Sequence, residues 1–450
     1  MQCNIYDKPR THNGATASRV SHLEQLRRAV LSCMLFEDTF YESGEDIAQR
    51  IKKLCALCPH DIIPTATDAK AMGIRHAPLL LAVEACRHAS RLSGVDRFIS
   101  EMITRADDLT EFCAIFAKSN GQSFTGLKLS SAAKRGLARA FGKFDEYQLA
   151  KYNRKTPIRL ADVLRLCHPK PMSDDQSELW KRLSKGTLAT PNTWETRLSS
   201  GEDKAKVFTD LLQSGRLGTL ALLRNLRTII EAGIDHGLIC RAIRDGDYSR
   251  MFPHQIATAI KAVDSLPYRP SAVLDCLCRM FQQCASVHTE GITGKTTVLI
   301  DVSVSMSEKL SGRSEVRLVD AAIALATCFR YTPMHDVEYF TFSNKLVHCQ
   351  YSDDLLAQWD KIDNSQVHYG TALAAAMREL NKRTTHHDRL IVITDEQSDP
   401  GYIPAPAFDK AYIINVAPYQ NGVEYGKYLH INGFSASVLK YIREIEHYDY

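Results

Sequence analysis

Apolar side chains recur at helical spacing through the first two thirds of the chain. The segment ADDLTEFCAIFAKSNG (residues 106–121) carries Leu109, Phe112, Ile115 and Phe116 between an acidic start and an Asn-Gly stop, which predicts an amphipathic helix. Strand patterns are almost absent from residues 20–288. About 270 residues of paired amphipathic helices are typical of a HEAT-like array, in which degenerate repeats of roughly 40 residues stack into a curved solenoid.

The pattern changes after HTEGITGK (residues 288–295). The β-rich runs TTVLID, DVEYFTFS, RLIVITD and AYIINV now alternate with the helical segments LVDAAIALATCFRY and TALAAAMRELNKR. This alternation predicts a mostly parallel sheet with helices on both faces. We therefore expect a multidomain chain with a polar N-terminal tail at 1–19, an all-α HEAT-like helical-repeat domain at 20–288, a linker at 289–294 and an α/β, Rossmann-like domain at 295–450.

Composition narrows the class of protein. The 450 residues are 44% hydrophobic and 24% charged, and no apolar run approaches the ~20 residues that a membrane helix needs, so we expect no membrane partner. The polar start of the sequence has no apolar core of the kind that a secretory signal requires. Thirteen scattered cysteines fit reduced thiols better than a disulfide framework. These observations predict a cytoplasmic protein.

Hard oxygen atoms gather around one strand end. In LIDVSVSM (residues 299–306), Asp301, Ser303 and Ser305 lie at alternate positions of an extended chain, so their side chains can converge. Open α/β sheets bind ligands beyond the carboxyl ends of their strands. Thr371, at the start of a helix, and Asp395, after the strand RLIVIT, stand at comparable points. Five such oxygens, completed by water, suit Mg²⁺ or another divalent cation.

These residues are open to other interpretations. They can instead cap a strand-to-helix turn, as such residues often do. An EF-hand is excluded, because Met306 stands where its turn needs glycine and Gly312 where it needs a bidentate glutamate. Two-metal hydrolysis requires a denser carboxylate cluster than Glu396 and Asp399 add. No nucleophile and base pair is evident either, so the sequence predicts no catalytic residues and no enzyme.

A basic stretch runs from Lys128 to Lys170. It holds eleven Lys or Arg against three Asp or Glu, whereas the whole chain has a net charge of only +4. Such a local excess is the electrostatic footprint of a polyanion-binding surface, and Tyr147 and Tyr152 add rings that can stack on bases. A merely solvated helix face is equally compatible with this composition. The candidate RNA-binding residues are Lys128, Lys134, Arg135, Arg139, Lys143, Lys151, Arg154, Lys155, Arg159, Arg165, His168 and Lys170.

The set formed by Asp301, Ser303, Ser305, Thr371 and Asp395 resembles the metal-ion-dependent adhesion site of von Willebrand factor A domains. The resemblance implies that the three hydroxyls bind the metal and that the two carboxylates act mostly through water. It also implies an open coordination position for the carboxylate of a partner.

Six segments follow one another along the chain in an order that resembles the TROVE domain of Ro autoantigen proteins, with an A-domain behind it. They read LFEDTFYESG, FDEYQLAKY, RLADVLRLCHPKP, LALLRNLRTIIEAG, FPHQIATAIKA and GKTTVLIDVSVSM. The resemblance implies a monomeric ring of HEAT-like repeats closed by the A-domain, with a basic inner channel and a basic outer face. It also assigns RNA binding to the stretch from Lys128 to Lys170, His168 included.

By this resemblance the protein is an RNA-binding scaffold, a component of ribonucleoproteins, and not a catalyst. The channel would take single-stranded 3′ ends of misfolded or structured non-coding RNA, and the outer face would take Y or Y-like RNA; no DNA partner is implied. Bacterial relatives act in RNA quality control, processing and decay, where a Y-like RNA can tether the exoribonuclease polynucleotide phosphorylase. The alternative is a Mg²⁺-dependent protein–protein interaction scaffold without RNA binding, and a metal-dependent RNA-cleaving enzyme ranks third.

Overall fold

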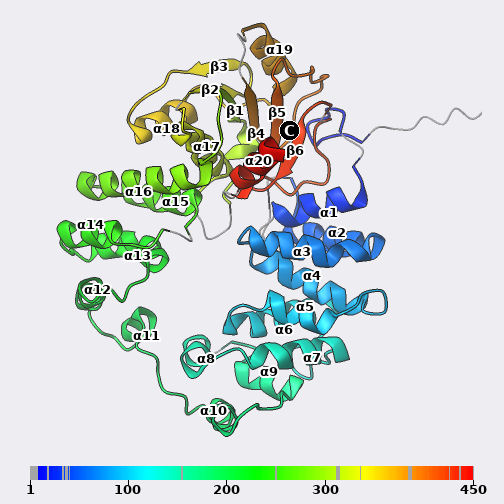
Figure 1. The fold of residues 1–450 in the computed structure, drawn as a ribbon, viewed down its shortest axis with the longest axis vertical. Coiled ribbons are helices and arrows are strands. Elements are labelled where there is room, and N and C mark those ends of the chain that lie inside the picture. Colours follow the sequence, from blue (N-terminus) through cyan, green and yellow to red (C-terminus); the bar gives the residue numbers. More distant parts are fainter. Residues whose placement is uncertain are drawn as a thin grey trace, which may run out of the picture. The chain divides into compact units, whose positions relative to one another are not determined.

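The computed structural model describes residues 9–17, 20–32, 35, 39, 41–153, 156–248, 251–310, 315–334, 336–383, 388–424, 426–434 and 437–448. The chain forms two compact units, which are coloured along the sequence in Figure 1. We call residues 1–47 with 204–450 the sheet unit, and residues 48–203 the helical unit. Each is described by itself.

The helical unit is built from short amphipathic helices that pack in neighbouring pairs. Helix α5 buries Val95, Phe98 and Ile99, and it packs against α7, as α3 packs against α4 and α7 against α9. Each helix thus covers the apolar face of a neighbour. The elements are α2 (Gly44–Leu57), which spans the boundary of the units, η1 (Pro59–Asp61), α3 (Ile62–Ala71), α4 (His76–Arg87), α5 (Val95–Met102), α6 (Ala106–Ser119), α7 (Ser131–Phe141), α8 (Glu146–Tyr152), α9 (Leu160–Cys167), α10 (Asp174–Lys185) and α11 (Trp194–Ser199).

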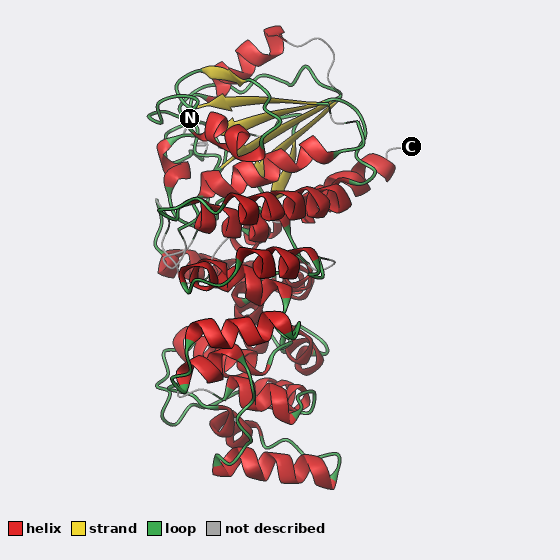
Figure 2. Cartoon of the chain, turned by 90° about the vertical axis from the view of Figure 1, so that its left-hand side faces the viewer, coloured by secondary structure: helices red, strands yellow, loops and turns green. Residues whose placement is uncertain are grey.

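The sheet unit combines further helices with all the strands in the described part of the chain (Figure 2). Its elements are α1 (His22–Leu31), α12 (Lys204–Gln213), α13 (Thr219–Glu231), α14 (His236–Arg244), α15 (Pro253–Asp264), α16 (Ser271–Thr289), β1 (Thr296–Asp301), η2 (Val304–Ser307), α17 (Leu318–Cys328), η3 (Phe329–Tyr331), β2 (Val337–Phe342), β3 (Leu346–Cys349), α18 (Leu355–Asp363), α19 (Leu373–Arg383), β4 (Arg389–Thr394), β5 (Lys410–Asn415), β6 (Leu429–Asn432) and α20 (Ser437–Tyr448).

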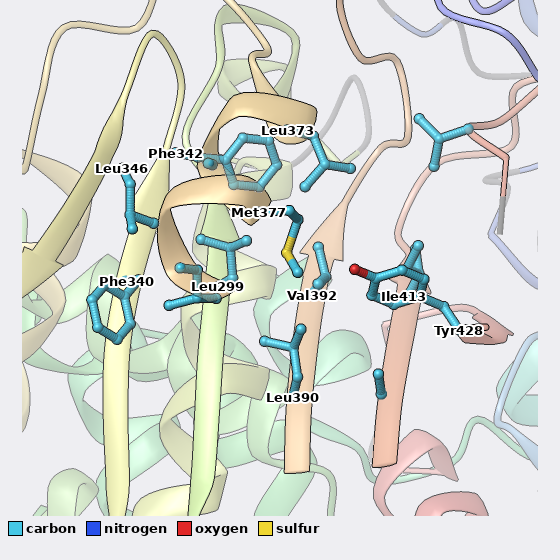
Figure 3. Close-up of a cluster of buried hydrophobic side chains, with 14 residues drawn as sticks. Leu299, Phe340, Phe342, Leu346, Leu373, Met377, Leu390, Val392, Ile413 and Tyr428 are labelled. Atoms are coloured by element: carbon cyan, nitrogen blue, oxygen red, sulfur yellow. The ribbon is translucent and has the colours of Figure 1, made fainter. Parts of the chain in front are cut away.

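The six strands form one sheet in the order β3-β2-β1-β4-β5-β6. All neighbours are parallel except β2 and β3, which form an antiparallel edge. On one face, Leu299, Phe342 and Val392 lie against Met377 of α19 (Figure 3). The predicted fold class, all-α helical repeats with an α/β domain, is confirmed. The last helix before the sheet ends at Thr289 and the first strand begins at Thr296.

The described part of the N-terminal segment packs on the sheet unit. Residues 9–17 form a hairpin in which Arg10 pairs with Thr16, and Ala17 forms a bridge with Val423. Ala15 and Ala17 are buried. In the described residues, no helix combines the length and apolarity that crossing a membrane requires.

An ion cluster joins three helices of the sheet unit, α15, α17 and α18. Asp320, in the first turn of α17, accepts hydrogen bonds from the backbone N and the guanidinium of Arg317 at 2.8–3.1 Å. The ammonium of Lys261 on α15 lies 3.2 Å from the same carboxylate, and Arg317 also contacts Asp363 of α18. Burial alone would raise the pKa of Asp320, but these partners hold it below its usual 3.8.

Replacing Asp320 should therefore destabilise the chain in a pH-dependent way. Asp320→Asn is expected to lower the free energy of unfolding at pH 7 by about 1.5–3 kcal/mol, because charge-assisted hydrogen bonds are lost. The folded-state pKa is depressed, so this contribution is complete above the unfolded pKa of 3.8 and fades as the pH falls through the lowered value. Urea denaturation at a series of pH values from neutral downward measures the difference in free energy of unfolding between the wild type and Asp320→Asn. The control is Asp360→Asn at an exposed position of α18. A difference in free energy of unfolding between wild type and Asp320→Asn that persists unchanged in acid would contradict the role given to the Asp320 carboxylate.

Candidate cation site and basic surface

The site begins where two neighbouring parallel strands end. Asp301 is the last residue of β1, and Asp395 follows the last residue of β4. Because β1 and β4 pair in parallel, both carboxylates lie at the same edge of the sheet. Ser303 N donates to Asp301 Oδ1 at 2.9 Å, and Thr394 Oγ1 donates to Asp301 Oδ2 at 2.6 Å. These bonds hold the first carboxylate in place.

The predicted hydroxyl residues are brought to the same edge. Ser303 Oγ and Ser305 Oγ lie 3.3 Å apart, and the Ser305 hydroxyl counters the rise that burial causes in the pKa of Asp395. Thr371 N donates to Asp399 Oδ2 at 2.9 Å, and Ser398 Oγ donates to the Thr371 carbonyl at 2.8 Å. The loop that carries Asp395 therefore also holds Thr371.

Gly370 gives the Thr371 loop its close approach to its neighbours. A Cβ at Gly370 would lie 2.6 Å from Asn344 Oδ1 and 3.2 Å from Asp399 Oδ2, so a side chain there would displace Asn344 and crowd Asp399, which binds Thr371 N. Ser343 Oγ accepts from Gly370 N at 3.2 Å and donates to its carbonyl at 2.7 Å. The backbone before Thr371 is thus held on both sides.

The electrostatics of the site favour a cation. All five side chains are almost completely buried, and burial raises the pKa of Asp301, which the neighbouring Asp395 raises further. Burial also raises the pKa of Asp395. Asp395 Oδ1 accepts from Gln397 N at 3.0 Å, whereas Oδ2 is buried without a hydrogen-bond partner among the described residues. Two buried carboxylates and one unsatisfied oxygen fit a divalent cation.

The donor set excludes softer metals. Within the described ranges, no three His, Cys, Asp or Glu side chains gather in a way that could hold a metal. Two carboxylates with three hydroxyls are hard oxygen donors, which Mg²⁺, Ca²⁺ and Mn²⁺ prefer, whereas zinc sites use thiolate and imidazole.

A buried ion cluster beside the site is absent from the sequence-based prediction. Arg28 Nη1 of α1 lies 2.6 Å from Glu396 Oε2, and His430 Nε2 of β6 lies 2.8 Å from Glu396 Oε1. Arg28 Nε also donates to the Tyr419 carbonyl at 2.6 Å. Burial alone would raise the pKa of Glu396, but Arg28 and His430 lower it. The three residues come from distant segments, so no local pattern in the sequence signals the cluster.

The basic stretch is only partly one surface. Lys134, Arg135 and Arg139 are exposed on α7, opposite the buried Leu137 and Phe141. Arg139 Nη2 lies 3.2 Å from Asp96 Oδ2. We call Lys134, Arg135 and Arg139 the α7 basic face.

Lys143 does not extend the α7 basic face. Helix α7 ends at Phe141, and Lys143 Nζ donates to the carbonyls of Ser100 and Ile103 at the end of α5. In the sequence, Arg135, Arg139 and Lys143 stand four residues apart, a spacing that predicts one helix with all three cations on the same side. The Lys143 ammonium instead satisfies helix C-terminal carbonyls, which favour a cation.

The other candidate RNA-binding residues are scattered over neighbouring elements. Lys128, Arg159 and Lys170 are exposed. Lys151 lies 6.0 Å and 5.7 Å from the rings of Tyr147 and Tyr152, a cation–π geometry. Arg154 and Lys155 lie outside the described residues.

Arg165 and His168 line a pocket of about 460 Å³ between α9 and α10. His168 ends α9 in the left-handed conformation, with φ +46°. The pocket adds Lys181 and Lys185 of α10, and Trp180 forms part of its wall. Both lysines come after the basic stretch in the sequence, so counting charges within that stretch missed them. We call Arg165, His168, Lys181 and Lys185 the α10 pocket cations.

Comparison with known families decides what kind of protein carries these surfaces. The family model described as TROVE domain matches residues 15–187 and 176–273. The chain belongs to the TROVE domain family. A crystal structure of the Deinococcus radiodurans Ro (RSR) protein matches with a TM-score of 0.60 and 19% identity, over 95% of this chain and 100% of that one. This likeness supports the fold.

Among curated proteins, telomerase protein component 1 of mouse is 34% identical over 85 residues, which are 18% of this chain and 3% of that protein. The rat protein is 32% identical over 98 residues, 20% and 4% of the respective chains. The chain thus spans only a few per cent of the length of these relatives. The predictions of a TROVE-domain protein and of a Ro-like fold are confirmed. RNA binding and the absence of catalysis stay predictions.

The ion cluster beside the site gives a stability prediction. Arg28→Met should lower the free energy of unfolding by about 3–5 kcal/mol, because Glu396 is left as an uncompensated buried charge. Urea denaturation measures it, with Arg383→Met as the control: that exposed i,i+4 pair with Glu379 contributes about 0.5 kcal/mol or less. The double variant Arg28→Met/Glu396→Met should recover part of the loss. Equal, small effects for both arginines would contradict a buried ion cluster.

Proposed function

We propose that this Ro-type protein binds single-stranded 3′ ends of misfolded or structured non-coding RNA and, on a second basic surface, Y or Y-like RNA. In this role it is a scaffold in RNA quality control, processing or decay. A bound Y-like RNA would in turn recruit polynucleotide phosphorylase or another exoribonuclease. The observation that carries the proposal is the α7 basic face in a chain of the TROVE domain family.

The chemistry of the helical unit supports RNA as the ligand. Lys134 and Arg135 have no ion pair or hydrogen bond among the side-chain contacts of the described residues, so their charges can meet phosphates without first breaking a contact. Lysine and arginine on a helix face neutralise phosphates and release counterions, which gives affinity without sequence preference. Single-stranded binding also needs stacking platforms, and Tyr147, half exposed beside Lys151, offers one.

The α10 pocket cations support a second contact region. Four basic side chains around one concave pocket can hold a phosphate or a flipped nucleotide, because RNA loops present unstacked bases and exposed backbone. The salt bridge between Arg165 and Asp162, 3.0 Å long, is exposed on both sides, so it costs little to exchange for a phosphate. We assign this pocket to the structured part of the RNA.

We further propose that Asp301, Ser303, Ser305, Thr371 and Asp395 hold Mg²⁺ or another divalent cation, and that this site binds the carboxylate of a protein partner. When bound, the cation supplies an open coordination position for a hard anionic ligand. The observation that supports a bound cation is Oδ2 of Asp395, which has no hydrogen-bond partner among the described residues. Exposed apolar side chains stand next to the site residues in the sequence: Val304, Val367, Tyr369 and Tyr402. Such a rim suits protein docking.

Removing the α7 basic face should weaken RNA binding and its salt dependence. For Lys134→Ala/Arg135→Ala, each lost phosphate contact reduces the slope of log affinity against log salt by about 0.7 for single strands. Fluorescence anisotropy with a structured RNA, with and without a single-stranded 3′ tail, measures both quantities. The wild type should prefer the tailed RNA.

The matched control is Lys382→Ala/Arg383→Ala at the exposed end of α19, which should keep the affinity and salt slope of the wild type. A wild type that ignores RNA at every salt concentration would refute the RNA proposal and favour the Mg²⁺-dependent protein scaffold. Mg²⁺-dependent cleavage of the RNA by pure protein would instead favour an enzyme.

Mg²⁺ should stabilise the fold without affecting RNA affinity. At a hundred times its Kd, a bound cation adds about 2.7 kcal/mol to the free energy of unfolding, and Asp301→Asn should abolish this gain. Without Mg²⁺ the variant should be at least as stable as the wild type, because one of two buried like charges is gone. Thermal unfolding with Mg²⁺ and with EDTA tests this, with the fully exposed Asp353 changed to Asn as control. A Mg²⁺ effect that survives in Asp301→Asn would place the cation elsewhere.

A further inference from the structure

The hairpin of residues 9–17 has a turn that places one side chain at its tip. Ala17 N donates to the Pro9 carbonyl at 2.7 Å, Thr11 N to the Ala15 carbonyl at 3.0 Å, and Gly14 N to the Thr11 carbonyl at 3.0 Å. Gly14 has φ +91°, a conformation that glycine adopts without steric cost. The turn therefore has a defined geometry, and Asn13 occupies its tip.

The hairpin is anchored on the loops that carry the cation site. Thr11 is 4% exposed, and its Oγ1 donates to the Ser398 carbonyl at 2.9 Å. His12 N donates to Gln397 Oε1 at 2.8 Å. Asn421 Nδ2 donates to the Arg10 carbonyl at 3.0 Å. Gln397 and Ser398 are two and three residues after Asp395, so the hairpin binds the segment that also carries a predicted metal ligand.

The amide of Asn13 contacts one of the site residues, Thr371. Its Nδ2 is 3.4 Å from Thr371 Oγ1 and 2.6 Å from the Gln397 carbonyl. Its Oδ1 accepts from the Tyr41 hydroxyl at 2.9 Å, and Tyr41 is also hydrogen-bonded to Ser305. Asn13 and Tyr41 thus connect the Thr371 loop to the Ser305 loop from above the sheet edge.

The hairpin of residues 9–17 and Tyr41 lie against the hydroxyl residues of the site, which are buried. Ser303, Ser305 and Thr371 are each only 2% exposed, although Val304 between the two serines is 42% exposed. A site that docks a partner's carboxylate through an open coordination position needs that position to face solvent. Here the side chains of the hairpin and Tyr41 occupy the approach.

We propose that Asn13 is an internal occupant of the docking position: the hairpin of residues 9–17 and the carboxylate of a protein partner compete for the same cation. The inference rests on the proposed cation site. The amide presents Nδ2 to Thr371, so binding the cation requires Asn13 to rotate and bring Oδ1 there as a neutral oxygen ligand. This rotation gives up the hydrogen bonds to the Gln397 carbonyl and from the Tyr41 hydroxyl. A carboxylate is the stronger ligand for a hard cation, so an acidic partner displaces Asn13 and releases the hairpin tip.

Mn²⁺ as the metal and acetate as the carboxylate probe test the competition in the full chain. Proton relaxation counts the exchangeable waters on bound Mn²⁺, and electron paramagnetic resonance with ¹³C-acetate detects acetate bound to the metal. We expect wild-type Mn²⁺ to carry few waters and to respond weakly to acetate. Asn13→Ala should add about one water, as one ligand position of an octahedral cation is opened, and should strengthen acetate binding about tenfold. Asn13→Asp should tighten Mn²⁺ binding about tenfold, because a carboxylate replaces an amide.

Two further variants separate the possible failures. Thr16→Ala, at the other end of the hairpin, should behave as the wild type, and Thr11→Ala, which removes the anchor on Ser398, should resemble Asn13→Ala. If Mn²⁺ binds neither the wild type nor the Asn13 variants, the cation site itself is refuted and this inference with it. If Mn²⁺ binds all of them but the Asn13 variants keep the wild-type water count, acetate response and Mn²⁺ affinity, the cation site stands and the internal occupant is refuted.

Discussion

The parallel register of β1 and β4 places two carboxylates at one buried sheet edge, and much of the sheet unit is arranged around that placement. Two buried like charges are unfavourable without compensation. Backbone N–H groups and a threonine hydroxyl bind Asp301 and one oxygen of Asp395, and Arg28 and His430 compensate the adjacent Glu396. One carboxylate oxygen, Oδ2 of Asp395, has no hydrogen-bond partner among the described residues. The fold thus concentrates negative charge in a place that a small cation can neutralise.

Helix α7 of the helical unit shows the opposite arrangement, since its cations are exposed and its packing is apolar. In α7 the buried side is made of Ala, Leu and Phe, and the cations stand on the other side. Exposed charges contribute little to stability, so stability does not constrain their number and position, and ligand binding can determine both. The sheet unit has its candidate cation site in the core, whereas α7 carries its candidate RNA-binding residues on the surface.

The sequence predicted what local periodicity determines. The helices, the mostly parallel sheet and the positions of Asp301 and Asp395 at strand ends follow from patterns of 3.6 and 2 residues. The strand order, which pairs β1 with β4, comes from the structure alone. The sequence did not predict where Lys143 points, because that depends on carbonyls of α5 some 40 residues earlier. Nor did it predict Arg28 beside Glu396 or Asn13 beside Thr371. Each of these contacts joins residues that are far apart in the sequence, and no periodic pattern in the sequence indicates such a pair. Charge counting located a basic stretch but not the α10 lysines that complete its pocket.

The contact between Arg28 and Glu396 spans 368 residues, and this separation has a consequence in time. At a synthesis rate of about 5–20 residues per second, Arg28 is made roughly 20–70 s before its partner. During that interval α1 has neither the carboxylate that compensates its buried guanidinium nor the strand β6 that it contacts. The apolar face of α1 therefore remains uncovered until β6 has been synthesised. A nascent chain of this design relies on chaperones or on rapid release to avoid wrong partners.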